Sequence, residues 1–263
     1  FICFSEMTCS GLYFLLVKLG PKSNWTLSPH PIHSRGMHVV FRVDSSLQMG
    51  SGHLMRCLTL AEALHQRGVR VAFITRDLPW NLNFLISQSG FTLNAYSPKG
   101  PDLDGYEDSD HCISYLRASA EVVDWLVVDH YALDEKWEKA VRLHARQVFV
   151  IDDLANRSHD CSVLLDQNYY SNFESRYDRL VPPSCRKLLG PRFALLRKEF
   201  LEVGRPSSVR DGQIRKILVF FGGTDPTNET RKVLEGILLT GQDWKIEVVI
   251  GATHPNRSDI EVL

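Results

Sequence analysis

The stretch Val39-Val40-Phe41-Arg42-Val43, followed by the turn Gly50-Ser51-Gly52-His53, decides the fold class of this chain. The first segment is typical of a short buried strand, and after the turn apolar residues recur at helical spacing through residues 54–66. Gly68 then supplies a C-terminal helix stop. A strand, a glycine turn and a helix form the first half of a βαβ unit, in which ligands bind at the carboxyl ends of the strands. The glycine turn is therefore the first candidate site.

His53 lies where this turn enters the predicted helix. The glycines let the backbone approach a ligand closely, and the free N–H groups of a helix start favour anionic or electron-rich atoms. The positive end of the helix dipole opposes protonation of a histidine at that place, which suits a neutral general base. A helix-capping or packing histidine is the alternative interpretation.

The composition is that of an ordinary soluble globular protein. Of the 263 residues, 44% are hydrophobic and 23% are charged, and the formal net charge is −1. This balance gives no reason to expect binding to nucleic acid or to a membrane surface. The six cysteines are scattered without a C-x-x-C pair, which favours reduced thiols in the cytoplasm over a disulfide scaffold or a zinc knuckle.

Strand and helix patterns alternate from Met37 onward. We predict strands at residues 39–43, 69–75, 91–96, 125–128, 147–151 and 162–166, helices at residues 54–66, 80–89, 111–122 and 134–145, and a loop at residues 97–110. This alternation predicts an α/β protein with a parallel, doubly wound sheet.

Changes in composition divide the chain into three parts. Residues 1–36 lack the periodicity of the rest, and we expect a leader that is not part of the fold. Residues 37–200 are predicted to form a Rossmann-like domain that holds the substrate and the catalytic groups. After a charged segment with glycine and proline at residues 197–212, the pattern restarts, with strands at 216–221 and 244–250 and a helix at 228–239. Residues 213–263 are therefore predicted to begin a nucleotide-binding Rossmann-like domain that is truncated here and faces the first across a cleft.

Polar residues follow the predicted strands of the first domain at four places. These loops are residues 44–53, Asp129-His130-Tyr131, Asp152-Asp153 and Asp166-Gln167-Asn168. Because parallel strands end at one edge of the sheet, we expect these loops to form a site for a small ligand rich in hydroxyl or amide groups. Helix capping or turn formation is the alternative for each pair.

A metal site is the weaker interpretation of the same residues. The side chains of His53, Asp129, His130 and Asp153 are metal-ligand types, but none of them stands at a recognised metal spacing. No G-x-S-x-G nucleophile motif is present either. We therefore expect a site without metal or other cofactor.

The turn Gly222-Gly223-Thr224-Asp225 follows a predicted strand and precedes a predicted helix. This placement is typical of a phosphate-binding turn, although the Walker lysine and the full G-x-G-x-x-G spacing are absent. At the start of a second Rossmann-like unit, the turn fits the diphosphate of a nucleotide that lies between two domains.

Several motifs, taken in order between Met37 and Ile250, resemble the UDP-sugar hydrolases of pseudaminic acid biosynthesis. They are Arg42-Val43-Asp44-Ser45-Ser46, Gly50-Ser51-Gly52-His53-Leu54-Met55-Arg56-Cys57-Leu58, Asp129-His130-Tyr131, Ile151-Asp152-Asp153, Leu165-Asp166-Gln167-Asn168, Gly190-Pro191-Arg192-Phe193-Ala194-Leu195-Leu196-Arg197 and Phe221-Gly222-Gly223-Thr224-Asp225.

The resemblance implies the two-domain architecture of MurG-like glycosyltransferases, known as the GT-B type. It implies release of UDP from UDP-2,4-diacetamido-2,4,6-trideoxy-β-L-altropyranose by attack of water at the anomeric carbon, with inversion and without a metal. It assigns catalysis to His53 and Tyr131. The strand-end loops and the motifs together predict the substrate-binding residues, which are Arg42, Asp44, Gly50, Ser51, Gly52, Asp129, His130, Asp153, Asn168 and Arg197. The diphosphate is expected to bind to Gly222, Gly223, Thr224 and Asp225.

The chemistry of a UDP leaving group suits these residues. Ordinary glycosidases need two carboxylates because an alkoxide leaves poorly, whereas UDP leaves as a stabilised anion, so one general base can suffice. Asp129 or Asp153 is expected to orient His53, and the sequence does not distinguish between them. Two other functions remain open: a glycosyltransferase of the same architecture, in which an acceptor hydroxyl replaces water, and an inactive fragment that binds a sugar nucleotide.

Overall fold

The computed structural model describes residues 36–46, 48–100, 106–119, 121–202, 211–223, 225–251 and 254–262. The expected leader therefore lies outside the described residues, except for Gly36, which is exposed. Met37 is half-buried and packs against the core. Thr224, expected at the phosphate-binding turn, also lies outside the described residues.

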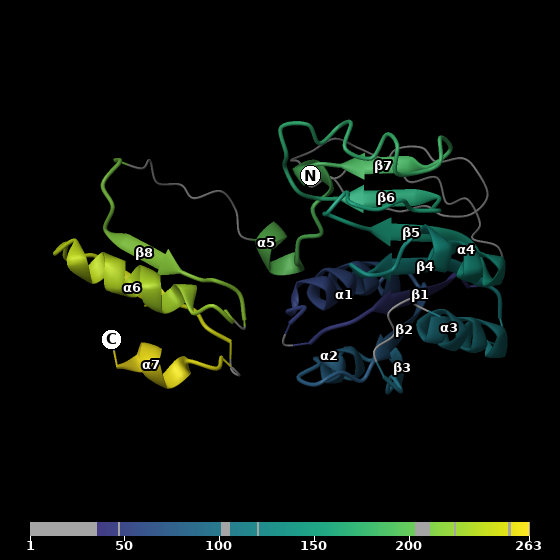
Figure 1. Ribbon diagram of the computed structural model, residues 1–263, viewed down its shortest axis with the longest axis horizontal. Helices are drawn as coiled ribbons and strands as arrows, with labels where there is room; N and C mark the ends of the chain where they lie inside the picture. The colour runs from purple at the N-terminus through teal and green to yellow at the C-terminus, as the bar shows by residue number, and fades with distance from the viewer. Residues whose placement is uncertain are drawn as a thin grey trace.

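A parallel seven-stranded sheet forms the first unit, and its strand order is β3-β2-β1-β4-β5-β6-β7 (Figure 1). All of its neighbouring strands pair in parallel. The strands are β1 (His38–Val43), β2 (Arg70–Arg76), β3 (Thr92–Tyr96), β4 (Val123–Asp129), β5 (Ala145–Ile151), β6 (Val163–Asp166) and β7 (Arg186–Leu189). The predicted α/β class with a parallel sheet is confirmed.

Helices pack against both faces of this sheet. One face meets α1 and α2, and the other meets α3 and α4, so the strands are buried on both sides. The helical elements are α1 (Gly52–His65), α2 (Asn83–Gln88), α3 (Tyr106–Ala118), α4 (Glu135–Val141), a 3₁₀ turn at Arg142–His144, a second 3₁₀ turn at Pro191–Phe193, and α5 (Lys198–Glu202). No helix of the described residues is long and apolar enough to cross a membrane.

From β1 the chain adds β2 and β3 on one side of the sheet, and it then returns to add β4 on the other side of β1. Strands β1 and β4 are neighbours, and their carboxyl ends meet because Val43 pairs with Asp129. In doubly wound sheets the crevice at such a switch point is where ligands bind. The loop that leads into α1, whose second residue is His53, leaves β1 at this place.

In the first unit the structure differs from the sequence-based expectation at α3 and β7, and α5 forms within the segment that was expected to be a linker. Helix α3 begins at Tyr106, inside the segment expected to be a loop, because the acidic residues of its first turn suit a helix N-terminus and Asp108 is buried against Arg42. Strand β7 was not expected, since its four residues begin with Arg186 and Lys187 and lack an apolar run. It gains its place by pairing with β6.

The second unit contains β8 (Lys216–Val219) and β9 (Lys245–Val248), which pair in parallel, with α6 (Glu229–Leu239) and α7 (Arg257–Glu261). Its core contains Val219, Leu234 and Ile260. This agrees with the expected restart of the βα pattern, while α7 was not expected. The arrangement of two domains about a cleft remains a proposal.

Candidate active site

The start of α1 is shaped by the glycine turn. Gly50 adopts a φ of 74°, in the left-handed region that favours glycine, and its N–H donates to the Ser46 carbonyl at 2.9 Å. Ser51 is the N-cap residue of α1, but its side chain makes no capping hydrogen bond. His53 does not cap the helix either, because its ring turns toward the end of β4.

His53 and Asp129 form a buried pair at the switch point. Nδ1 of His53 lies 2.5 Å from Oδ1 of Asp129, and the two side chains are 4% and 1% exposed. An ionised carboxylate accepts hydrogen bonds only, so Nδ1 carries the proton and Nε2 is left as the acceptor. Within the described residues Nε2 makes no hydrogen bond. Of the two carboxylates considered from sequence, Asp129 is thus the one that orients His53.

Arg56 lies one turn after His53 on α1 and holds the same carboxylate. Its Nε and Nη2 donate to the two Asp129 oxygens at 2.5 and 2.6 Å, and its Nη1 donates to Asp153 at 3.1 Å. Burial alone would raise the pKa of Asp129, but the hydrogen bonds from Arg56 and His53 outweigh burial and hold that pKa below its ordinary value. Asp129 therefore stays ionised.

Tyr131 packs against His53 and is open to solvent. The two rings meet edge to face with centroids 4.4 Å apart, and Tyr131 is 40% exposed. Partial burial and the charge of Asp153 raise the pKa of Tyr131 to about 12, so the phenol keeps its proton at neutral pH and can donate a hydrogen bond. A hydrogen bond from this phenol to Asp153 also contributes to the raised pKa, and Oδ1 of Asp153 is buried with no other partner within the described residues.

Arg42, Asp44 and His130 form a buried ionic network behind this site. Arg42 donates to both oxygens of Asp44 at 2.7 and 2.9 Å and also pairs with Asp108. Nε2 of His130 lies 3.2 Å from Asp44, and Arg76 bonds the same carboxylate at 2.6 Å. Burial lowers the pKa of His130 despite its hydrogen bond to Asp44. Because these side chains are nearly inaccessible, their geometry suits support of the loops at the ends of β1 and β4.

Two further expected residues come from the segments that follow β6 and β7. Asn168 is half-buried after β6, and its backbone N–H donates to Asp166 at 3.0 Å. Arg197 is exposed, and it lines a small cavity of about 190 Å³ with Arg56 and Gly52, together with Met55, Thr59, Leu195, Leu196 and Phe200. Arg56 thus touches both this cavity and the His53–Asp129 pair.

The turn of the second unit is organised by Asp225. Its two carboxylate oxygens accept the backbone N–H groups of Glu229 and Thr230 at 2.9 and 2.8 Å, and it is 3% exposed. Asp225 therefore caps α6 and takes two of the free N–H groups that a phosphate would use. Gly222 adopts a φ of 82°, and a side chain built on Gly251 would collide with the Gly223 carbonyl, so the backbone packs closely at this turn.

Sequence reasoning missed three arginines of this region as site residues: Arg56, Arg76 and Arg157. A signal existed for Arg56, since a residue three positions after His53 lies on the same face of a helix. No such signal existed for Arg76, whose partner Asp44 is distant in sequence, or for Arg157, which binds two backbone carbonyls of another loop besides the nearby Asp152. Within the described residues no three His, Cys, Asp or Glu side chains are grouped to hold a metal ion.

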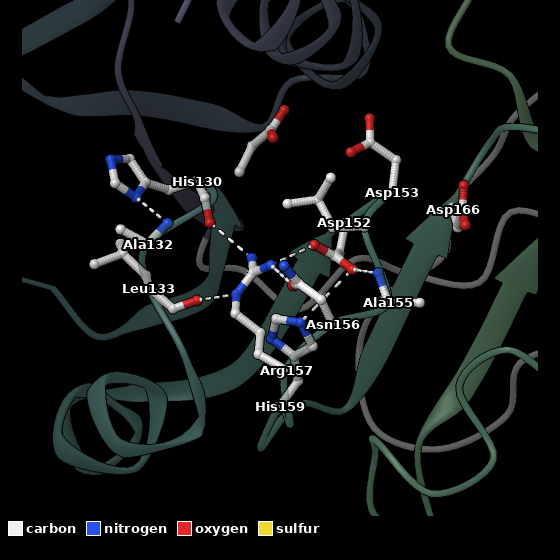
Figure 2. Close-up of polar contacts among 12 residues, drawn as sticks. His130, Ala132, Leu133, Asp152, Asp153, Ala155, Asn156, Arg157, His159 and Asp166 are labelled. Atoms are coloured by element: carbon white, nitrogen blue, oxygen red, sulfur yellow. Dashed lines mark hydrogen bonds and ion pairs between the residues drawn. The ribbon is translucent and has the colours of Figure 1, made fainter.

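A second buried acid–histidine cluster lies behind the loop that follows β5 (Figure 2). His159 donates through Nδ1 to Glu138 at 2.7 Å, and its Nε2 lies 3.9 Å from Asp152, an ion-pair distance. Burial opposes the charge on His159, yet Asp152 and Glu138 together raise the pKa of His159 to about 9, against the nearby Arg157.

This raised pKa predicts a loss of stability at alkaline pH. Because the folded-state pKa of about 9 exceeds the ordinary value of 6.5, the stabilisation is complete below pH 6.5 and is lost as the pH rises through 9. We expect the free energy of unfolding to fall by at most about 3 kcal/mol over that window. Urea unfolding at several pH values measures this change. His159→Gln should flatten the dependence, because it removes the imidazole whose pKa Asp152 and Glu138 raise. An identical pH dependence in the two proteins would contradict the prediction.

Comparisons with known proteins give two distant relatives. No protein-family model matches the chain. The chain is 26% identical over 231 residues to an uncharacterised protein of Methanocaldococcus jannaschii, covering 86% of this chain and 45% of that protein. It is 27% identical over 225 residues to the UDP-2,4-diacetamido-2,4,6-trideoxy-beta-L-altropyranose hydrolase of Campylobacter jejuni, covering 86% of this chain and 73% of that protein. The chain thus spans less than half the length of the first relative and about three quarters of the second.

Among solved structures, MurG of Acinetobacter baumannii aligns with 86% of this chain and 71% of its own, with a TM-score of 0.49 and 12% sequence identity.

Proposed function

We propose that this chain hydrolyses a UDP-activated sugar at its anomeric carbon and releases UDP and the free sugar. The observation that carries the proposal is the His53–Asp129 pair at the switch point of the sheet, where Nδ1 is hydrogen-bonded to the carboxylate and no described residue occupies Nε2, the nitrogen that would accept a proton. The name of the Campylobacter jejuni relative supports the substrate class.

The proposed reaction needs one proton acceptor. Nε2 of His53 takes a proton from water while the water oxygen bonds to the anomeric carbon, and the bond from that carbon to the phosphate oxygen breaks. The electron pair leaves with UDP, which is a stabilised anion and needs no strong acid, and Asp129 stabilises the imidazolium that forms. Attack from the face opposite the leaving group inverts the anomeric configuration.

The proposed substrate is a 2,4-diacetamido-2,4,6-trideoxy sugar linked to UDP, as in pseudaminic acid biosynthesis and flagellin glycosylation. The Tyr131 hydroxyl and Oδ1 of Asp153 offer a donor and an acceptor to its amide or hydroxyl groups. A side chain built on Gly223 would lie 4.0 Å from the Ser51 hydroxyl, so the turn of the second unit lies beside the start of α1, and the proposed diphosphate binds to the backbone N–H groups of this region. In this proposal residues 37–200 hold the sugar and residues 213–263 begin the nucleotide-binding domain, in a cytoplasmic enzyme.

The test is UDP release from UDP-2,4-diacetamido-2,4,6-trideoxy-β-L-altropyranose in buffer without an acceptor. We expect UDP to appear at the same rate before and after treatment with EDTA, because the proposed steps use no Lewis acid. Proton NMR at early times should show the inverted anomer of the free sugar. UDP release only after addition of an acceptor alcohol would indicate a glycosyltransferase, and a rate that EDTA abolishes and a divalent ion restores would overturn the metal-free proposal.

A further inference from the structure

Arg157 belongs to the loop after β5, and its side chain reaches the loop after β4; these two loops carry groups around His53 (Figure 2). Its Nη2 donates to the His130 carbonyl and its Nε to the Leu133 carbonyl, both at 2.8 Å. Its Nη1 donates to Oδ1 of Asp152 at 2.7 Å. The Arg157 side chain is only 14% exposed. One guanidinium therefore joins the loop after β4 to the loop after β5.

Asp152 gives this contact a rigid anchor. Its Oδ2 accepts the Ala155 N–H at 2.9 Å and the Tyr177 hydroxyl at 2.8 Å, and its side chain has no exposed surface. Arg157 forms a buried charged pair with this carboxylate, and such hydrogen bonds between ionised groups are stronger than neutral ones. Because Asp152 is held from several sides, the position of Arg157 is determined from the β5 loop.

The carbonyls that Arg157 binds belong to the loop of the proposed catalytic residues. His130 stands between Asp129 and Tyr131, so a bond to its carbonyl restrains the backbone next to both. Asp152 stands directly before Asp153, whose carboxylate accepts from Arg56. Arg157 itself forms no hydrogen bond to His53, Tyr131 or Asp153.

We infer that Arg157 is a positioning residue, which sets the placement of Tyr131 and Asp153 relative to each other and to His53 by tying their two loops together. This inference rests on the proposed hydrolysis for its kinetic consequence, but the tie between the loops is a property of the fold alone. Arginine suits this role because its planar fork directs donors in several fixed directions at once, whereas lysine offers one compact charge.

The kinetic test compares Arg157→Lys and Arg157→Gln with the wild-type chain. We expect kcat for UDP release to fall about 10- to 100-fold in both, with a smaller change in KM, because a displacement of about 1 Å at a reacting site costs up to this factor. Arg142→Gln is the matched control, since Arg142 makes an exposed ion pair with Asp160 nearby. It should retain wild-type kinetics. Added guanidinium should partly restore kcat to Arg157→Ala and leave Arg142→Ala unchanged.

Hydrogen exchange provides a second measurement that needs no substrate. Peptides that cover residues 129–134 and 152–156 should exchange faster in Arg157→Gln than in Arg142→Gln, including the Ala132 and Ala155 amides. If the wild-type chain released no UDP, the hydrolase proposal would fail while exchange would still decide whether Arg157 joins the loops. Unchanged exchange, or a kcat per folded molecule equal to that of the wild type, would overturn the inference.

Discussion

Replacing His53 by asparagine is expected to lower UDP release by about 10²-fold or more, the effect of losing a general base. Among the described residues, His53 is the histidine whose ring nitrogen lies 2.5 Å from the Asp129 carboxylate. Asparagine has no basic nitrogen that could accept the proton of water. The fold and the binding of the sugar nucleotide should be retained, because the substitution keeps a polar group of smaller size next to Asp129. Stopped assays of UDP release and a UDP-sugar titration measure the two quantities separately.

The matched control is His65→Asn at the other end of α1. His65 is exposed in the last turn of this helix and packs edge to face against Phe91, with ring centroids 5.6 Å apart. It should keep wild-type turnover. Turnover of His53→Asn close to that of the wild type would show that His53 is a packing histidine and not the base.

Asp129→Asn is expected to lower kcat by up to as much as the loss of the base itself, about 10²- to 10⁴-fold, as the loss of the aspartate does in a serine protease triad. The amide nitrogen can donate to Nδ1 of His53, so the ring proton moves to Nε2 and the acceptor that faces the substrate is lost. The variant also gives up the carboxylate to which Arg56 donates twice. Single-turnover measurements at saturating substrate report the chemical step directly.

Asp124→Asn tests the same substitution at the other end of β4. Asp124 accepts the His38 N–H at 2.9 Å and is partly exposed, far along the strand from His53. Its turnover should match the wild type. Because Asp129 is fully buried, thermal unfolding of both variants should accompany the assay, so that kcat is expressed per folded molecule. A folded Asp129→Asn protein within a few-fold of wild-type kcat would refute this role of the carboxylate.

Local patterns predicted the elements that stand nearest to the proposed site. The apolar run before the glycine turn became β1, the helical spacing after it became α1, and the run before Asp129 became β4. These predictions succeeded because side-chain periodicity and glycine conformations are properties of neighbouring residues. Strand β7 was not predicted because its formation depends on pairing with β6, and the periodicity of the sequence carries no information about that pairing.

Buried charge was the feature that sequence reasoning interpreted least well. Arg42 stands in an apolar strand, and the structure shows it fully buried and paired with Asp44 and with Asp108 of α3, while its expected contact with the substrate stays a prediction. The acidic start of α3 was expected to be a loop because Arg42, the ion-pair partner of Asp108, is 66 residues away in the sequence. A charged residue can be interpreted correctly only when the neighbour that neutralises it is known.

The sequence by itself determined the α/β class, the glycine turn that begins α1, and the set of polar residues at the strand ends. Each of these depends on the order of residues within one short segment. The tertiary structure decided which of these residues are in contact. Asp129 rather than Asp153 lies at Nδ1 of His53, and Arg56 donates hydrogen bonds to both carboxylates. Arg157 connects the loop after β5 to the loop after β4. Those contacts join residues on different strands and helices, so they exist only after the sheet order β1-β4-β5 has aligned the carboxyl ends of these strands at one edge.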